Sequence, residues 1–215
     1  MKERPVLFSA TMVRAILDGR KTQTRRIIKP QPYIDEMGNF CWNGENFGQD
    51  FNGPCIQAIA SPIPSSKTKR VRCPYGKPGD RLWVRETFNH DGEKYIYAAD
   101  LNELGVQKWA AQWKPSIHMP RSASRILLEI TGVRVERLQD ISEEDAIAEG
   151  ISRVPFRPCD GWPICDGYMV GKDDGVTGLA AKASTAYKKL WESINGPGSW
   201  DMNPFVWVVE FRRIN

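Results

Sequence analysis

The sequence predicts an α+β fold, built on a small mixed or antiparallel β-barrel with short flanking helices and two long insertions. Its 215 residues suit a single domain over residues 1–215 better than two full-sized units. About five segments alternate polar and apolar residues as strands do, and about three shorter segments have helical spacing. Loops separate the strand candidates instead of regular crossover helices, which favours a barrel over a doubly wound parallel sheet.

The first helix and the first strand are expected close to the N-terminus. Ser9 or Thr11 can cap a short helix of about two turns, because their hydroxyls accept hydrogen bonds from the first free amides. The segment 21–28 then alternates β-branched and polar residues, which predicts a strand. On such a strand Thr24 and Arg26 lie on the same face.

The remaining elements follow the same reasoning. The pattern Ser142-Glu143-Glu144-Asp145 is a capping box, and it predicts a short acidic helix. Apolar residues at helical spacing predict an amphipathic helix over residues 183–194. Period-two alternation or a continuous apolar run predicts the other strands, at residues 81–86, 95–98, 125–137 and 205–212.

Two segments lack any sustained period. Residues 31–78 and 152–180 are rich in proline and glycine, so both are interpreted as long, irregular insertions. Most of the eight tryptophans belong to predicted core faces. Those in irregular segments are candidate platforms for stacking a base, namely Trp42, Trp113 and Trp162.

Positive charge is concentrated in two parts of the chain. Lys and Arg number 30 against 26 Asp and Glu, a net charge of +4. Residues 1–30 and residues 61–85 each have a net charge of +6, so the rest of the chain is acidic. Clustered cations attract phosphate or nucleic acid, whereas the alternative is two ordinary solvated stretches.

Several classes of protein are excluded or disfavoured. The chain has no run of eighteen apolar residues, and residues 1–5 lack the apolar stretch of a secretion signal, so we expect a cytoplasmic protein without a membrane partner. The five cysteines include no C-x-x-C pair and stand far from the two histidines, which predicts free thiols and no metal site. No nucleotide-binding or hydrolase motif occurs, and no cofactor is expected.

The segment Gly19 to Arg26 has the composition of a reactive site. It places Lys21 among three arginines and two threonines, where a helix gives way to a strand. Neighbouring cations and burial both disfavour an ammonium ion, and a neutral amine can take the proton of the Thr24 hydroxyl. The alternative is a solvated basic strand, or one that contacts phosphates.

Three further residues are candidates for a pocket. Glu129 and Glu86 are flanked by apolar residues in predicted strands, where an unpaired carboxylate is costly. Each therefore serves either as the group that delivers a proton to a leaving nitrogen or as a structural partner of an arginine. His118 lies between two prolines, where it either lines a pocket or is a hydrogen-bonded structural residue.

The segment Gly19-Arg20-Lys21-Thr22-Gln23-Thr24-Arg25-Arg26 resembles the signature of the ASCH domain family, a branch of the PUA-like β-barrels. Other parts agree in order along the chain. Residues 77–84 are similar to the family's barrel turn and strand, residues 142–150 to its acidic helix, and residues 207–211 to its closing strand. The layout is closest to the larger members that prophages often carry.

The resemblance implies an activity as well as a fold. A compact bacterial branch of the family hydrolyses N4-acetylcytidine with a lysine, a threonine and a glutamate, which fall here on Lys21, Thr24 and Glu129. Arg26 would then hold the base carbonyl or a phosphate. The alternative is an RNA-binding module or ribonuclease that uses Lys21–Arg26 and Lys67–Arg72, and a third possibility is a barrel that only binds other proteins.

Overall fold

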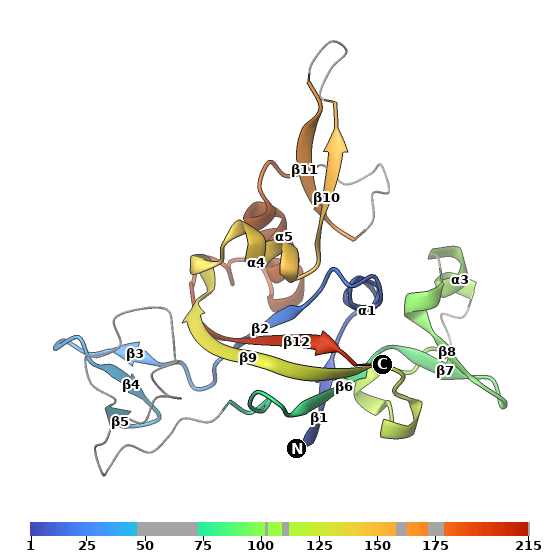
Figure 1. Ribbon diagram of the computed structural model, residues 1–215, viewed down its shortest axis with the longest axis horizontal. Coiled ribbons are helices and arrows are strands. Elements are labelled where there is room, and N and C mark those ends of the chain that lie inside the picture. Colours follow the sequence, from blue (N-terminus) through green and yellow to red (C-terminus); the bar gives the residue numbers. More distant parts are fainter. Residues whose placement is uncertain (47–72, 102, 109–111, 158–162, 172–178, 215) are drawn as a thin grey trace.

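The computed structural model describes residues 1–46, 73–101, 103–108, 112–157, 163–171 and 179–214. These residues form a mixed α+β structure around a five-stranded sheet (Figure 1). The strands occur in the order β1-β6-β9-β12-β2, and only β1 and β6 are parallel. Their bounds are Glu3–Leu7 (β1), Gln23–Ile27 (β2), Arg81–Arg85 (β6), Leu127–Arg137 (β9) and Phe205–Arg213 (β12).

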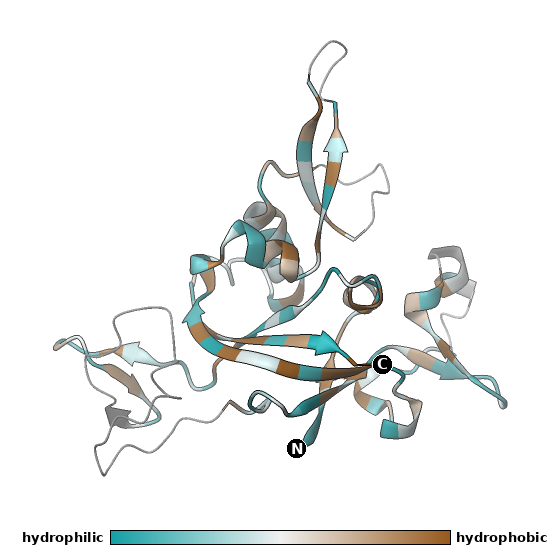
Figure 2. Cartoon of the chain, viewed as in Figure 1, coloured by the Kyte–Doolittle hydropathy of each residue, from teal (hydrophilic) through white to brown (hydrophobic). Residues whose placement is uncertain are grey.

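The sheet is buried on both faces near its centre. In β12, Val206 and Val208 belong to one hydrophobic core, whereas Trp207 and Val209 belong to the other. Burial on both faces explains why this strand is a continuous apolar run. Figure 2 shows the hydrophobic and hydrophilic residues that alternate along β9. The long strands at the centre of the sheet were therefore correctly predicted from their patterns.

Helices cover the sheet and connect its strands. Helix α1 (Ala10–Leu17) links β1 to β2 at opposite edges of the sheet, and the Ser9 hydroxyl caps it by accepting from the Met12 amide. Helix α4 (Glu143–Ala148) is capped by Ser142, and it packs with α5 (Ala183–Asn195) over one core. These three predicted helices are confirmed. A further helix, α3, spans Glu103–Lys108.

Smaller sheets extend from this centre. Strands β7 (Phe88–His90) and β8 (Tyr95–Tyr97) pair as one antiparallel hairpin. Short 3-10 helices complete the regular structure, at Ala98–Asp100, Ser116–His118, Arg121–Ala123 and Leu138–Asp140.

The insertions are more regular than their composition predicts. In the first, β3 (Tyr33–Ile34), β4 (Phe40–Trp42) and β5 (Glu45–Asn46) form a small antiparallel sheet. In the second, β10 (Ile151–Phe156) and β11 (Cys165–Val170) form a six-residue ladder. Strands of two or three residues, and strands interrupted by Pro155 or Gly167, give too short an alternation to be recognised. The basic run Lys67–Arg72 and Trp162 lie outside the described residues.

A β-bulge changes the alternation of side chains along β9. Val209 and Phe211 are two residues apart on β12, but their partners on β9 are Val133 and Ile130, so Thr131 is an additional residue. Close packing accompanies the bulge, because a Cβ atom added at Gly132 would lie 2.3 Å from the Glu210 carboxylate. The residues of β9 that precede the bulge therefore face the opposite way from a regular strand.

The edge strands of the sheet are connected by a side chain. Arg26, on β2, donates from Nη2 to the carbonyl oxygen of Leu7 at the end of β1, over 2.6 Å. Its guanidinium carbon also lies 5.5 Å from the centre of the Phe8 ring.

Among the described residues, no helix has the length and apolar character needed to cross a membrane.

Candidate functional site

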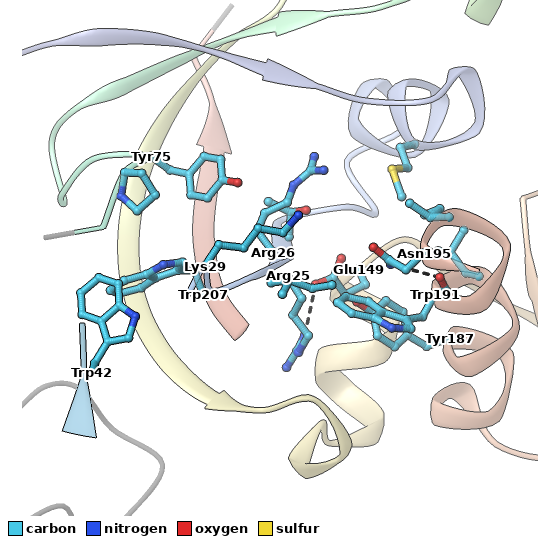
Figure 3. Close-up of a pocket in the computed structure, with 16 residues that line it drawn as sticks. Arg25, Arg26, Lys29, Trp42, Tyr75, Glu149, Tyr187, Trp191, Asn195 and Trp207 are labelled. Atoms are coloured by element: carbon cyan, nitrogen blue, oxygen red, sulfur yellow. Dashed lines mark hydrogen bonds and ion pairs between the residues drawn. The ribbon is translucent and has the colours of Figure 1, made fainter. Parts of the chain in front are cut away.

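A cleft of about 490 Å³ lies beside β2, between helix α5 and the two described ends of the first insertion (Figure 3). One end is formed by Glu149 and by residues of α5, and the other end is formed by Trp42, Trp207 and Tyr75. Arg26 and Lys29 lie between these ends. The lining residues are Met12, Thr24, Arg25, Arg26, Ile27, Lys29, Trp42, Pro74, Tyr75, Glu149, Tyr187, Leu190, Trp191, Ile194, Asn195 and Trp207.

Lys21 is buried behind the wall of this cleft. Its Nζ atom donates to the Oε2 atom of Glu149 over 2.7 Å and to the carbonyl oxygen of the same residue over 2.8 Å. The turn that follows α4 allows this approach. Gly150 adopts a positive φ of 102° there, and a Cβ atom at this position would press against Ala15 and Lys21. The lysine and the glutamate therefore form an ion pair with almost no access to solvent.

Burial disfavours the charged form of Lys21. Loss of water lowers the pKa of Lys21, and the positive charges of Arg26 and Arg25 lower it further. Glu149 acts in the opposite direction through its charge and its hydrogen bond, but the net pKa remains below the ordinary value for lysine. A neutral amine is thus more accessible at Lys21 than at a lysine on the surface.

Arg25 fixes the other oxygen of Glu149. Its Nη1 atom lies 3.2 Å from Glu149 Oε1, and its remaining donors bind Glu136 over 2.8 Å and Asp145 over 2.6 Å. Burial alone would lower the pKa of Arg25, but Glu149 and Glu136 reverse this effect and raise it. Arg25 is therefore a permanent cation, and it holds Glu149 with one oxygen toward Lys21.

Thr24 brings a hydroxyl to the same cleft. It is 3% exposed and lines the wall, one residue before Arg25 on β2. In the register of the sheet it lies opposite Val209, and Arg26 lies opposite Trp207, so both point to the same face as predicted. Thr24 and Arg26 therefore both line the cleft, and Lys21 lies behind its wall through its contact with Glu149.

The structure places Glu129 elsewhere. Because Thr131 is an additional residue in β9, Glu129 pairs with Arg212 on the sheet face opposite to that of Thr24 and Val209. Its carboxylate accepts from Arg212 Nη2 over 2.9 Å, and its side chain is 30% exposed. The expected grouping of Glu129 with Lys21 and Thr24 is therefore corrected. The bulge that separates them leaves no clear pattern in the sequence.

Glu86 and His118 do not reach the cleft either. Glu86 is buried, and it accepts from the Nε and Nη2 atoms of Arg125 over 2.9 Å and 3.0 Å. His118 is exposed in a 3-10 helix. Neither residue lines the cleft, so the expectation that they bind substrate there is corrected. For Glu86 the alternative role, a structural partner of an arginine, is the one observed.

Glu149 was missed by the sequence-based reasoning. That reasoning considered only carboxylates within apolar strands, whereas Glu149 ends the acidic helix and precedes Gly150. A signal was present, because a Glu-Gly pair after a capped helix places an acid at a tight turn. Of the predicted stacking residues, Trp42 lines the cleft, whereas the Trp113 indole donates to the Val106 carbonyl away from it.

Other comparisons add no assignment. The described residues contain no cluster of three or more histidine, cysteine, aspartate or glutamate side chains that could hold a metal ion. Comparison of the chain with known protein families, with curated proteins and with solved structures finds no significant match.

Proposed function

We propose that this protein is an ASCH-type amidohydrolase with a PUA-like barrel, which removes an acyl group from N4 of a modified cytidine. The observation that carries the proposal is the buried pair of Lys21 Nζ and Glu149 Oε2, 2.7 Å apart, behind a cleft whose wall includes Thr24. The lysine and the threonine are those that the family resemblance implies. Glu149 takes the role that the sequence-based interpretation gave to Glu129.

The reaction would begin with proton transfer. Lys21, as the neutral amine, accepts the proton of the Thr24 hydroxyl while the oxygen forms a bond to the acyl carbon. The C–N bond then breaks, its electron pair goes to the exocyclic nitrogen, and Glu149 relays a proton from Lys21 to that nitrogen. Water next attacks the Thr24 ester, which releases the carboxylic acid and restores the hydroxyl.

The cleft fits a nucleoside in size and in chemical character. A cleft of about 490 Å³ is within the range of small-molecule sites, which are lined by apolar and aromatic side chains with a few polar groups. Tyr187 and Trp191 give an aromatic wall close to Glu149, against which a base can stack. The curled sheet, with its edge strands joined by Arg26 and Leu7, supports the proposed barrel.

The test is hydrolysis of N4-acetylcytidine by the purified full-length protein. We expect cytidine and acetate in equal amounts, measured by chromatography. N4-methylcytidine is the matched control, since it has the same base but no acyl carbon to attack. If N4-acetylcytidine is bound and recovered intact across neutral and alkaline pH, the proposed chemistry is wrong.

The second candidate is an RNA-binding module without hydrolysis. It is favoured by Lys29, an exposed cation at the cleft that has no carboxylate partner among the described residues. Such a module would bind single-stranded RNA through several phosphates, and its affinity would fall steeply with added salt. Hydrolysis of the free nucleoside at a rate insensitive to salt would argue against it.

A further inference from the structure

The charged side chains of the cleft that have no ion-pair partner among the described residues are both positive. Four ionisable side chains line the cleft, apart from tyrosines: Arg25, Arg26, Lys29 and Glu149. The Glu149 carboxylate already pairs with Lys21 and Arg25, and Arg25 has two further acidic partners. In the described part of the chain no carboxylate pairs with Arg26 or Lys29. The cleft therefore offers two uncompensated cations to a ligand.

Arg26 also has an unused donor. Its Nε atom is buried and has no hydrogen-bond partner among the described residues, whereas Nη2 is occupied by the Leu7 carbonyl. An unmade hydrogen bond at a buried charged donor is costly, so such groups are usually paired with protein, water or ligand. The Trp191 indole N–H, at the other end of the cleft, is buried and unpaired in the same way.

Arg26 and Trp191 thus keep donors that no described protein group satisfies. An arginine next to a lysine is the usual arrangement for binding phosphate oxygens, because both are cations and the guanidinium presents several donors. Figure 3 shows Arg26 and Lys29 in the middle of the cleft, between the aromatic residues Trp42 and Trp207 on one side and Glu149 on the other. A phosphate bound by these two cations would therefore lie away from the reacting group.

The aromatic end is held in place by the insertion. Trp42 donates from its indole nitrogen to the Pro30 carbonyl over 2.6 Å, and its ring meets Trp207 edge to face at 6.3 Å. Trp42 and Tyr75 come from the two described ends of the segment 31–78. An aromatic surface beside two cations suits a sugar or base that follows a phosphate.

We infer that the substrate of this cleft is phosphorylated, with the phosphate bound by Arg26 and Lys29 and the acylated base at the Glu149 end. The inference rests on the proposed function for the identity of the base, but phosphate binding can be tested independently. A mononucleotide and an RNA chain both supply this phosphate. A free nucleoside has no phosphate, so it would leave the charges of Arg26 and Lys29 without a partner.

The experiment compares three probes by calorimetry with the full-length protein: cytidine, cytidine 5′-monophosphate and the dinucleotide cytidylyl-cytidine. We expect the monophosphate to bind roughly tenfold or more tightly than cytidine, which corresponds to one or two charge-assisted hydrogen bonds. Lys29→Gln should remove most of this difference. Lys94→Gln is the matched control, because Lys94 is also exposed but lies in the β7–β8 hairpin.

Each outcome separates the possibilities. Tighter binding of the dinucleotide than of the monophosphate identifies an RNA chain as the source, and the reverse identifies a mononucleotide. Equal affinities for cytidine and its monophosphate, or an equal loss in Lys29→Gln and Lys94→Gln, would overturn the inference. If N4-acetylcytidine is hydrolysed without a preference for phosphate, only the inference fails. If phosphate is preferred and N4-acetylcytidine is not hydrolysed, only the proposed reaction fails.

Discussion

Glu149 and Glu86 are both buried carboxylates, with exposed fractions of 2% and 1%, but their surroundings differ. Glu86 gives both oxygens to one guanidinium, that of Arg125, which also binds Asp100. Glu149 divides its oxygens between Lys21 and Arg25. Only Glu149 lines the cleft. The same side chain is thus used in two different electrostatic environments.

The difference lies in the partner more than in the carboxylate. A guanidinium does not lose its proton in a protein, so the Glu86–Arg125 pair cannot transfer one and acts as a structural connection. Burial raises the pKa of Glu86, and Arg125 only partly opposes that rise. The partner of Glu149 is an amine whose pKa is lowered by burial. A buried carboxylate becomes available for acid-base chemistry when its partner can lose a proton.

The largest expected effect is the loss of activity in the Lys21→Ala and Thr24→Ala variants. Each removes a group that forms or breaks a bond, and such losses are of the order of a thousandfold or more. The measurement is kcat/KM for N4-acetylcytidine. Thr22→Ala is the matched control, because Thr22 is an exposed threonine next to Lys21 that does not line the cleft. Equal loss in Thr22→Ala and Thr24→Ala would remove Thr24 from the mechanism.

The second prediction compares the two carboxylates directly. Glu149→Gln leaves the buried Lys21 without its carboxylate, so it should lower the free energy of unfolding by about 3 kcal/mol. Glu86→Gln should cost less, because Arg125 is partly exposed and keeps Asp100 as a partner. Unfolding in urea measures both changes. Only Glu149→Gln should also reduce kcat, about a hundredfold, if it relays the proton. A similar fall of kcat in the two folded variants would contradict the distinction between them.

The third prediction concerns pH. The proposed step needs the neutral Lys21 amine, so the rate should rise with pH and level off above the lowered pKa of Lys21. Glu149 opposes that lowering, and therefore Glu149→Gln should move the rising limb to lower pH, whereas Glu86→Gln should leave it in place. The sign for stability follows as well. Because the unfolded chain binds this proton more tightly, stability should increase as the pH rises between the folded and unfolded pKa values.

Features that depend on neighbouring residues were easier to predict from the sequence than contacts between distant ones. Thr24 and Arg26 were correctly placed on one face, because residues two apart on a strand point the same way. The capped helices at Ser9 and Ser142 were correct because a capping pattern is local.

The third member of the site could not be found in this way. Glu149 meets Lys21 across 128 positions of sequence, through a turn whose path depends on Gly150. Glu129 was excluded by one additional residue in a strand, which reverses the facing of every side chain before it. Such a bulge depends on packing between β9 and β12 and has no local sequence pattern that predicts it.

The smallest expected effect separates the acid assigned from sequence from the acid assigned from structure. Glu129→Gln breaks an ion pair with Arg212, which is 67% exposed, so the loss of stability should stay below about 1 kcal/mol. Since Glu129 lies on the far face of the sheet, kcat/KM and its pH profile should remain those of the natural protein. The measurement pairs Glu129→Gln with Glu149→Gln under identical conditions. A large fall of kcat in Glu129→Gln, with Glu149→Gln active, would mean that the bulge at Thr131 is absent in solution and that Glu129 faces the cleft.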